Sequence, residues 1–234
     1  MQQALNLADQ ALFITSPNPR VGCVIVDAQG KVIGQGHTQK AGGPHAEIVA
    51  LQDAAQRGHS VEGATVYVTL EPCAHQGRTG PCCDALVQAK VGKVVAALTD
   101  PNPLVAGQGF DRLRAAGIEV QVGDGASEAA HQNPGFLSRM QRQKPWVRMK
   151  IAASLDGQTA LQNGQSQWIT GPEARADGHA WRARACAILT GIGTVLEDNP
   201  LLDLRLCTQL GPTPRMPHLV IVDSRLETPL DARL

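Results

Sequence analysis

The first 123 residues alternate between apolar positions at helical spacing and short apolar runs. Ala4, Leu5, Ala8, Ala11 and Leu12 recur at the spacing of an amphipathic helix. Because predicted helices and strands alternate, we expect a mixed sheet with helices on both faces. In chain order, the pattern predicts a helix over 2–13, strands over 21–26 and 31–36, a helix over 45–56, a strand over 65–69, a helix over 81–90, a strand over 93–98, a helix over 109–116 and a strand over 119–122.

A polar stretch over 124–144 follows and predicts a helix or loop that connects two units. From Pro145 the run WVRMKIAAS is strand-like, and the segment LDGQTALQNGQSQW after it is rich in turn-forming residues. Beyond these segments we expect a helix over 173–185 and strands over 187–190 and 218–222. The sequence therefore predicts a first domain over 1–123, a connecting segment over 124–144 and a second domain over 145–234.

Charge and composition narrow the class of protein. Lys plus Arg and Asp plus Glu both number 21, and no basic run marks a nucleic-acid surface. No run of eighteen apolar residues predicts a membrane span, and the N-terminal stretch lacks the regions of a signal peptide. We therefore expect a cytoplasmic protein. Three of its six cysteines fall between Cys73 and Cys83, and in a reducing compartment such a cluster indicates metal binding or catalysis rather than disulfides.

The segments GGPHAEIVAL and LEPCAHQGRTGPCCDAL carry the candidate chemistry. Hydrolytic removal of an amino group from an aromatic amidine requires a hydroxide at neutral pH and a group that carries protons. Zinc with three protein ligands and an open position supplies the hydroxide, and a neighbouring carboxylate carries the protons. Zinc deaminases carry the zinc ligands and this carboxylate in the signature H-x-E followed by P-C-x-x-C, in which the glutamate carries protons and is not a ligand. Here His45 and Glu47 form H-x-E, Cys73 follows a predicted strand, and Cys82 lies in the first turn of a predicted helix, whose N-terminus favours a thiolate.

The spacing of the cysteines leaves more than one ligand set open. Eight residues separate Cys73 from Cys82, whereas the general signature has two. We favour Cys82 over Cys83 because the next helical position points about 100° away. His75 is an alternative ligand, and either His75 or Cys83 could instead close a purely structural four-ligand zinc site. Free buried thiols are a further alternative.

Further motifs resemble the bifunctional riboflavin biosynthesis deaminase/reductase family, within the cytidine deaminase superfamily. The matching stretches are SPNPRVGCVIV, GQGH, HAE, TLEPCAHQGRTGPCC, TDPNP and AGQG, and the long spacing between Cys73 and Cys82 is the family's own pattern. The resemblance extends over essentially the whole chain. It implies a cytidine-deaminase-like three-layer α-β-α sandwich with a mixed sheet. It also implies hydrolytic deamination of diaminohydroxyphosphoribosylaminopyrimidine to 5-amino-6-(5-phosphoribosylamino)uracil.

The resemblance assigns roles to residues of the first domain, which becomes a zinc-dependent deaminase domain. Glu47 would be the catalytic proton carrier. The zinc ligands would be His45, Cys73 and Cys82. The substrate contacts would be Asn18, His37, His75 and Arg78, the last of them opposite the phosphate. A surface position for Arg78 and a structural role for each histidine are the alternatives.

The second half resembles the family's reductase domain, which has a dihydrofolate-reductase-like fold and uses NADPH. The matching stretches are KIAASLDGQTAL, GQSQWITG, ARAD, RARACAILTGIGTVLEDNPLL and VIVDS. The resemblance places Lys150 and Asp156 at the reductase site. The cofactor positions are Ala152, Trp168, Thr194, Asp198 and Ser224, and the substrate positions are Ser166, Arg182, Leu202 and Arg205. A core position for Trp168 and a helix-surface position for Arg182 are the alternatives.

The length of this second region leads to a further expectation. Roughly ninety residues are about half of what such a reductase domain needs, and the family's later glycine-rich loop for the cofactor phosphate is absent. A half sheet would leave an unpaired edge. We therefore expect a truncated reductase domain with weak or missing NADPH-dependent reduction.

Three other functions share part of the pattern. A nucleic-acid deaminase would show the short P-C-x-x-C spacing and a basic rim, and a deaminase of free nucleosides would lack the reductase-like second half. A non-enzymatic zinc scaffold would not depend on Glu47. As partners we expect a small phosphorylated pyrimidine, no nucleic acid and no membrane, and a homo-oligomer is compatible with the sequence.

Overall fold

The computed structural model describes residues 1–75, 80–103, 105–207 and 215–234, which fall into two compact units, residues 1–146 and residues 147–234. The elements of the first unit are α1 (Gln2–Gln10), β1 (Gly22–Val26), β2 (Val32–His37), α2 (Ala46–Gln56), β3 (Thr65–Val68), α3 (Cys82–Gln88), β4 (Lys93–Ala96), α4 (Gln108–Ala115), β5 (Glu119–Val122), α5 (Ala126–Gln132) and α6 (Pro134–Arg142). The elements of the second unit are α7 (Pro172–Arg184), β6 (Ala187–Gly191), α8 (Ile192–Asp198) and β7 (His218–Val222).

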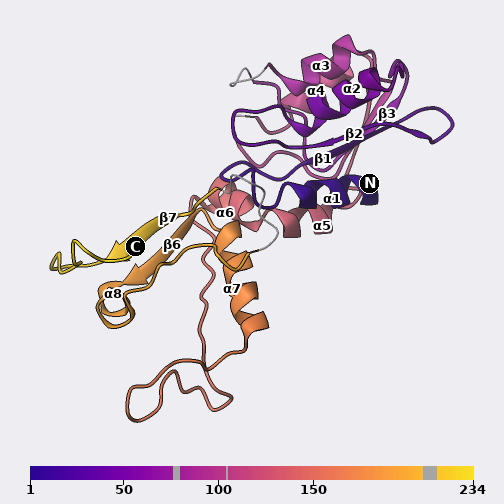
Figure 1. Ribbon diagram of the computed structural model, residues 1–234. Helices are drawn as coiled ribbons and strands as arrows, with labels where there is room; N and C mark the ends of the chain where they lie inside the picture. Colours follow the sequence, from indigo (N-terminus) through magenta and orange to yellow (C-terminus); the bar gives the residue numbers. More distant parts are fainter. Residues whose placement is uncertain (76–79, 104, 208–214) are drawn as a thin grey trace. The chain divides into compact units, whose positions relative to one another are not determined.

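A five-stranded mixed sheet forms the centre of the first unit, in the order β2-β1-β3-β4-β5 (Figure 1). Strand β1 pairs antiparallel with both β2 and β3, whereas β3, β4 and β5 are parallel. The carboxyl ends of β3 and β4 therefore meet at one edge of the sheet, where open α/β sheets commonly carry their sites.

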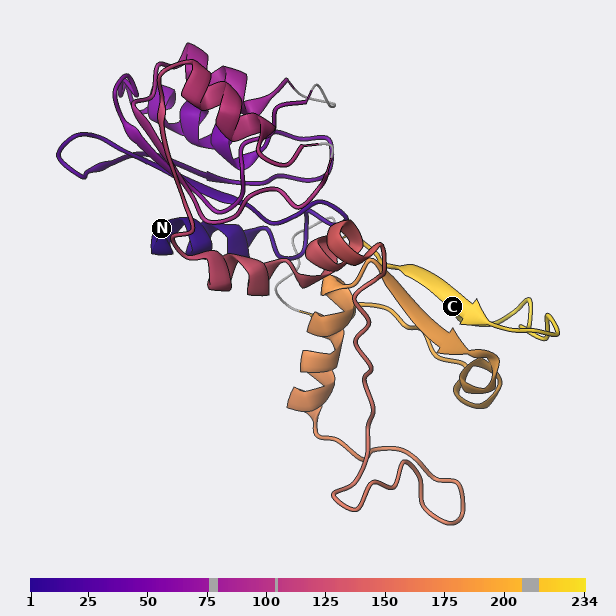
Figure 2. The same ribbon diagram turned by 180° about the vertical axis from the view of Figure 1, so that it is seen from behind.

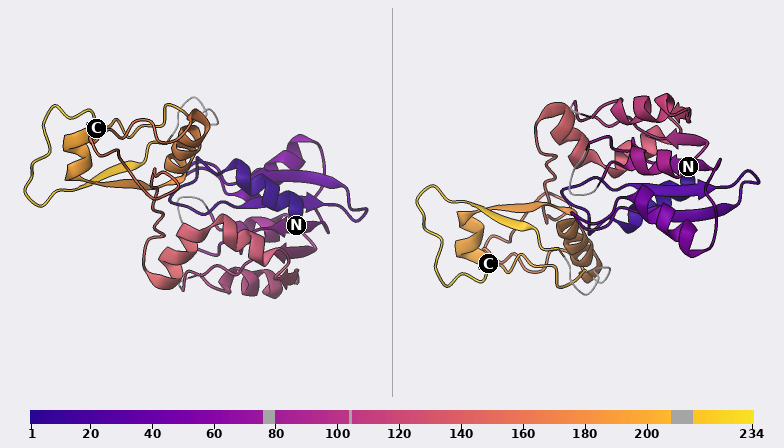
Figure 3. Two further views of the ribbon diagram at one scale, coloured as in Figure 1. Left: turned by 90° about the horizontal axis from the view of Figure 1, so that it is seen from below. Right: turned by 90° about the horizontal axis from the view of Figure 1, so that it is seen from above.

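Helices cover both faces of this sheet. Helices α1 and α5 lie side by side on one face, and α2, α3 and α4 lie on the other (Figures 1 and 2). The opposite views from below and above show the two helical layers in turn (Figure 3). The predicted three-layer α-β-α sandwich with a mixed sheet is thus confirmed.

Two glycines let α2 lie directly against β2. Gly34 and Gly36 point to the same face of the strand because side chains alternate across it. A Cβ atom on Gly36 would lie 2.7 Å from the backbone nitrogen of Ala50 and 2.8 Å from the carbonyl oxygen of Ala46. The first turns of α2 are therefore held by backbone contact with the sheet.

The core of the first unit consists of branched aliphatic side chains between the sheet and the helices. The sheet contributes fully buried residues such as Ile25, Val66 and Val94, and the helices contribute Leu86 and Leu113. Burying each such side chain stabilises the fold by about 1.5–3 kcal/mol relative to exposure. This core fixes the elements from which the candidate site is built.

The polar stretch over 124–144 forms α5 and α6 and belongs to the first compact unit. At the junction of the two helices, the Asn133 side chain accepts the N–H of Arg20 at 2.8 Å and donates to the Arg20 carbonyl at 2.9 Å. The Gln132 amide donates to the carbonyl of Leu5 at 2.9 Å. Polar side chains thus attach this segment to the first unit by hydrogen bonds, which hydrophobic periodicity does not reveal.

The second unit contains the parallel pair β6–β7 and the helices α7 and α8. The strand predicted for WVRMKIAAS is wrong: the segment has no partner among the described strands, and Val147, Met149 and Ile151 are 79%, 81% and 59% exposed. Extended backbone becomes a strand only through hydrogen bonds to a neighbour. Helix α8, which follows β6 directly, was not predicted. In the described part of the chain no helix is both long and apolar enough to cross a membrane.

Candidate metal centre

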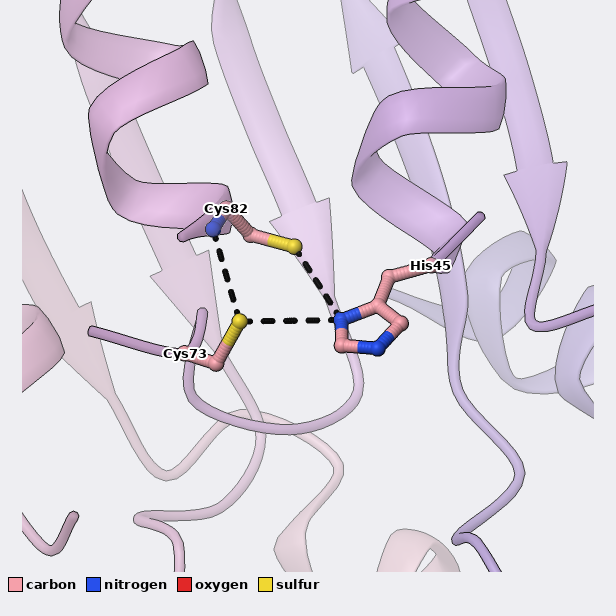
Figure 4. A group of neighbouring side chains, drawn as sticks. All are labelled: His45, Cys73 and Cys82. Carbon is pink, nitrogen blue, oxygen red and sulfur yellow. Dashed lines mark hydrogen bonds between the residues drawn. The ribbon is translucent and has the colours of Figure 1, made fainter. Parts of the chain in front are cut away.

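Three segments that are distant in sequence bring His45, Cys73 and Cys82 together (Figure 4). His45 is the N-cap residue of α2, Cys82 is the first residue of α3, and Cys73 lies in the segment that follows β3. The Nδ1 atom of His45 lies 3.3 Å from the Sγ atom of Cys82 and 3.6 Å from that of Cys73. All three candidate ligand atoms lie within 4.8 Å of one another.

These separations fit a tetrahedral metal ion. Zinc binds imidazole nitrogen at about 2.0–2.1 Å and thiolate sulfur at about 2.3 Å, so tetrahedral geometry separates nitrogen from sulfur by about 3.5 Å. The observed 3.3 and 3.6 Å bracket this value. The cluster of His, Cys, Asp and Glu ligand atoms found among the described residues has these three members, which matches a zinc site with one open position.

The two sulfurs are electrostatically coupled. The pKa of the Cys73 thiol is lowered, first because the Cys82 thiol donates a hydrogen bond to it, and the pKa of the Cys82 thiol is raised by the same bond. The backbone N–H of Cys82 also donates to the Cys73 sulfur at 3.4 Å. The shared hydrogen bond therefore favours a thiolate at Cys73 and a thiol at Cys82, and a bound cation would compensate the charge of a second thiolate. One imidazole and two thiolates form a donor set that suits zinc.

A buried carboxylate lies beside these ligands. Glu47 is the second residue of α2 and is 4% exposed. Desolvation by burial raises the pKa of the Glu47 carboxyl to about 7, and the charge of Cys73 adds to this effect. Glu47 also shares a hydrogen bond with the Cys82 side chain. A carboxyl group with this pKa holds and releases a proton near neutral pH.

The two alternative ligands lie elsewhere. The Cys83 thiol is buried and donates to the Asp84 carboxylate at 3.6 Å, while the Cys83 backbone N–H donates to the Cys73 carbonyl at 3.2 Å. His75 is exposed, and it is close enough to Asp100 to lower the pKa of that carboxyl, which desolvation raises. Neither residue belongs to the cluster of candidate ligands.

The predicted substrate contacts of the first unit have different surroundings. Asn18 is exposed in the turn after α1, where its backbone N–H donates to the Thr15 carbonyl at 2.9 Å. His37 ends β2 and is half-buried, and desolvation lowers its pKa. Its register places it opposite Gly22, at the end of the sheet from which the chain leads on to Cys73. Arg78 lies outside the described residues.

In the second unit the predicted residues form local contacts. The guanidinium of Arg182 donates to the Asp203 carbonyl at 3.2 Å, and that of Arg205 pairs with the Asp203 carboxylate. Trp168 is 68% exposed, and the Arg175 guanidinium stacks 4.4 Å from its ring centre. Most of the residues predicted for the reductase site are exposed, namely Lys150, Asp156, Ser166, Trp168, Thr194, Asp198, Arg205 and Ser224. The others are half-buried, namely Ala152, Arg182 and Leu202. The core position considered for Trp168 is not observed.

Sequence reasoning missed Glu71, a buried carboxylate two residues before Cys73. The signal available in the sequence was a charged residue at the end of an apolar strand, immediately before the Pro-Cys pair.

Comparisons with known proteins agree with this geometry. The family described as "Cytidine and deoxycytidylate deaminase zinc-binding region" matches residues 1–98, and the family described as "RibD C-terminal domain" matches residues 145–234. The chain is 54% identical over 205 residues to the riboflavin biosynthesis protein RibD of Escherichia coli, which covers 88% of this chain and 55% of that protein.

Two solved structures are similar over almost the whole chain. One is RibD of Acinetobacter baumannii (form 1), with a TM-score of 0.94, 51% identity, and coverage of 99% of this chain and 64% of that chain. The other is a diaminohydroxyphosphoribosylaminopyrimidine deaminase/5-amino-6-(5-phosphoribosylamino)uracil reductase of Thermotoga maritima. For this second structure the TM-score is 0.88 and the identity 40%, with coverage of 96% of this chain and 62% of that chain. The chain thus spans less than two thirds of the length of these relatives.

Proposed function

Because the chain belongs to the riboflavin biosynthesis deaminase/reductase family, we propose that its first unit deaminates diaminohydroxyphosphoribosylaminopyrimidine to 5-amino-6-(5-phosphoribosylamino)uracil. One observation carries the proposal: an imidazole and two sulfurs lie at the separations of tetrahedral ligands, beside a buried carboxylate. The printed name of the Thermotoga maritima protein states this substrate for that protein and so supports the choice.

Different residues would bind the metal and transfer protons in this reaction. His45 Nδ1 and the sulfurs of Cys73 and Cys82 would hold zinc. Zinc with three protein ligands lowers the pKa of a bound water to about 7 and supplies the nucleophile. The carboxylate oxygens of Glu47 accept a proton from the attacking water and deliver protons to the ring nitrogen and to the leaving amine. Since the pKa of Glu47 is about 7, both its protonated and its ionised forms are populated at neutral pH.

The substrate contacts complete the proposal. We assign Asn18 to the pyrimidine ring, Arg78 to the substrate phosphate, and His37 and His75 to the pocket around the substrate. The neutral total charge of the chain agrees with a small substrate rather than a nucleic acid, which is commonly bound by a basic surface. We place the reaction in the cytoplasm, where the cysteine ligands stay reduced.

The test is an ammonia-release assay combined with zinc quantification on the purified chain. Glu47→Gln removes the proton carrier and leaves the three ligands in place. General acid–base catalysis contributes typically about 10²- to 10⁴-fold, so we expect a loss of kcat of that size with one zinc retained per chain. The matched control is Glu62→Gln, which alters an exposed carboxylate in a 3.6 Å ion pair with Lys90 and should leave kcat unchanged.

Other outcomes of the same experiment favour the alternatives. A Glu47→Gln variant as active as the parent chain would refute the assigned role. A parent chain that binds zinc without releasing ammonia would favour the scaffold. Retention of tRNA in a filter-binding assay, together with release of ammonia from it, would favour a nucleic-acid deaminase, and turnover of free cytidine would favour a nucleoside deaminase.

For residues 145–234 we propose the reductase roles of the family, with Arg182 and Arg205 as substrate contacts and Trp168 at the NADPH position. Both guanidinium groups contact Asp203, so the two proposed substrate contacts lie close together. Well-formed cofactor sites bury most of their ligand, whereas Trp168 is 68% exposed. We therefore expect weak NADPH binding by this chain, measured by fluorescence titration, and slow NADPH oxidation, followed by its absorbance. Micromolar binding with steady turnover would contradict this.

A further inference from the structure

We propose that Glu71 is a positioning residue of the deaminase site, which fixes the segment after β4 and the start of α4 relative to the ligand Cys73. The inference rests on the proposed deaminase function. Glu71 touches neither the candidate ligands nor Glu47 in the contacts described, and it acts through backbone groups.

The carboxylate of Glu71 accepts four backbone N–H groups. Its Oε2 atom accepts from Asp100 and Gly107, both at 3.0 Å. Its Oε1 atom accepts from Gly109 at 2.9 Å and from Phe110 at 3.4 Å. The residue is 3% exposed, so these bonds replace water completely. A buried carboxylate with its acceptor sites filled in this way holds its donors in a fixed arrangement.

The same residue is tied to the sheet through its backbone. Its N–H donates to the carbonyl of Leu98, just after β4, at 2.8 Å. The side chain therefore connects the carboxyl ends of β3 and β4 with the N-terminus of α4, whose first N–H groups favour a negative charge.

These contacts lie close to the candidate ligands. Glu71 and Cys73 are separated only by Pro72, and a Cβ atom on Gly109 would lie 2.0 Å from the Pro72 carbonyl oxygen. The start of α4 thus presses against the backbone that carries Cys73. A shift of the segment that Glu71 holds would therefore be transmitted to the backbone next to Cys73.

Helix α4 also contacts the other cysteine-bearing segment. Arg112 of α4 forms an ion pair with Asp84 of α3 at 2.8 Å, and α3 begins with Cys82. Glu71 fixes the N-terminus of the helix that touches both cysteine-bearing segments, so its effect reaches beyond the four hydrogen bonds.

Glu71→Gln is the informative variant because it keeps the shape and replaces one acceptor oxygen by an NH₂ group. That group would face two N–H donors, so two of the four bonds are lost. We expect faster hydrogen exchange, followed by NMR, of the two amides that lose their acceptor, either Asp100 and Gly107 or Gly109 and Phe110. We also expect kcat/KM for ammonia release to fall by about 10- to 100-fold, as small misplacements at a site produce. The loss should appear mainly in KM because, among the described residues, Glu71 contacts neither the ligands nor Glu47.

The ligands themselves should stay in place. Zinc content should remain at one per chain, and the charge-transfer absorption of the cobalt-substituted protein should keep its wavelength and intensity. Glu62→Gln is again the matched control and should change none of these quantities. Glu71→Asp keeps the charge but is one methylene shorter, so its amide exchange and kcat/KM should change less than those of Glu71→Gln. If Glu71→Gln does not fold, the same measurements are made on Glu71→Asp.

The outcomes separate this proposal from the deaminase assignment. Unchanged exchange of the four amides, or an unchanged KM, overturns the positioning role. A loss of zinc and of kcat in parallel with a general loss of stability also overturns it, because the residue then only supports the fold. If the parent chain releases no ammonia, the proposed function fails, whereas the exchange and cobalt measurements still decide whether Glu71 holds the segment.

Discussion

The contact between β2 and α2 gives a direct way to disturb the site without touching it. Gly36→Ala adds a Cβ atom 2.7 Å from the backbone nitrogen of Ala50, 2.7 Å from the Val49 Cβ atom and 2.8 Å from the Ala46 carbonyl oxygen. Backbone atoms cannot rotate away as a side chain can. Helix α2 must therefore move from the sheet by several tenths of an ångström, and His45 and Glu47 move with its first turn.

Gly36→Ala should lower both the stability of the fold and the activity, for separate reasons. Overpacking of this kind costs typically about 1–3 kcal/mol of stability. A displacement near 1 Å in a catalytic group costs about 10²-fold in rate, so we expect kcat/KM to fall about 10- to 100-fold. Both the metal ligand and the proton carrier are displaced together, so the loss should appear mainly in kcat.

The matched control is Gly58→Ala, just beyond the other end of α2. Gly58 has φ +73°, and its added Cβ atom would meet nothing within 4 Å. Alanine in this left-handed conformation costs about 1–2 kcal/mol, which is comparable with the expected cost at Gly36. Urea unfolding should therefore show similar losses of stability, while the ammonia-release assay separates the two variants. Equal effects on kcat/KM, or a Gly36→Ala variant with full activity, would refute the reasoning.

Two further predictions concern the metal and the core. Removal of zinc with a strong chelator should abolish ammonia release, and one equivalent of zinc should restore it; activity that survives with no detectable metal would contradict the assignment of His45, Cys73 and Cys82. Leu86→Ala, at a fully buried position of α3, should lower the free energy of unfolding by about 2–5 kcal/mol in urea titration, and a loss below 1 kcal/mol would show that Leu86 is not part of the core.

Local periodicity was sufficient for the sheet and for helices α1 to α4 of the first unit. The apolar run of β1 and the polar tip at Asp27 predict the hairpin, and the Asp27 side chain accepts the N–H groups of Gln29 and Lys31 at 3.0 and 2.9 Å. The strand at 119–122 is found with the predicted bounds. Each of these elements is dictated by residues close together in sequence.

Hydrophobic periodicity was insufficient for segments whose structure depends on contacts with residues distant in sequence. The segment over 124–144 is polar, and it packs on the first unit through bonds such as that between Asn133 and Arg20. The run at 146–154 has strand-like composition, but a strand forms only by pairing with another strand, which local sequence does not specify, and the described strands provide no partner.

In the candidate site, too, some residues could be predicted from local sequence and others only from contacts distant in sequence. Residue type pointed to His45, Cys73 and a second cysteine because zinc chemistry restricts the ligands. Cys82 was favoured over Cys83 by the difference of about 100° between adjacent helical positions and by the resemblance to the family's spacing, and the structure brings His45, Cys73 and Cys82 together. The role of Glu71 depends on N–H groups that lie 29 to 39 residues further along the chain. No local pattern encodes such a contact.

The ligand-bearing segments are held by backbone contacts that do not involve a metal. Gly36 leaves no room for a side chain beneath α2, and Gly109 leaves none against the Pro72 carbonyl. The Cys83 N–H bonds to the Cys73 carbonyl at 3.2 Å and joins the two cysteine-bearing segments directly. A site whose ligands are placed by the fold loses little conformational entropy when the metal binds. Zinc removal should therefore abolish activity and leave the far-ultraviolet circular dichroism of the chain unchanged, in contrast to small domains that unfold without their metal.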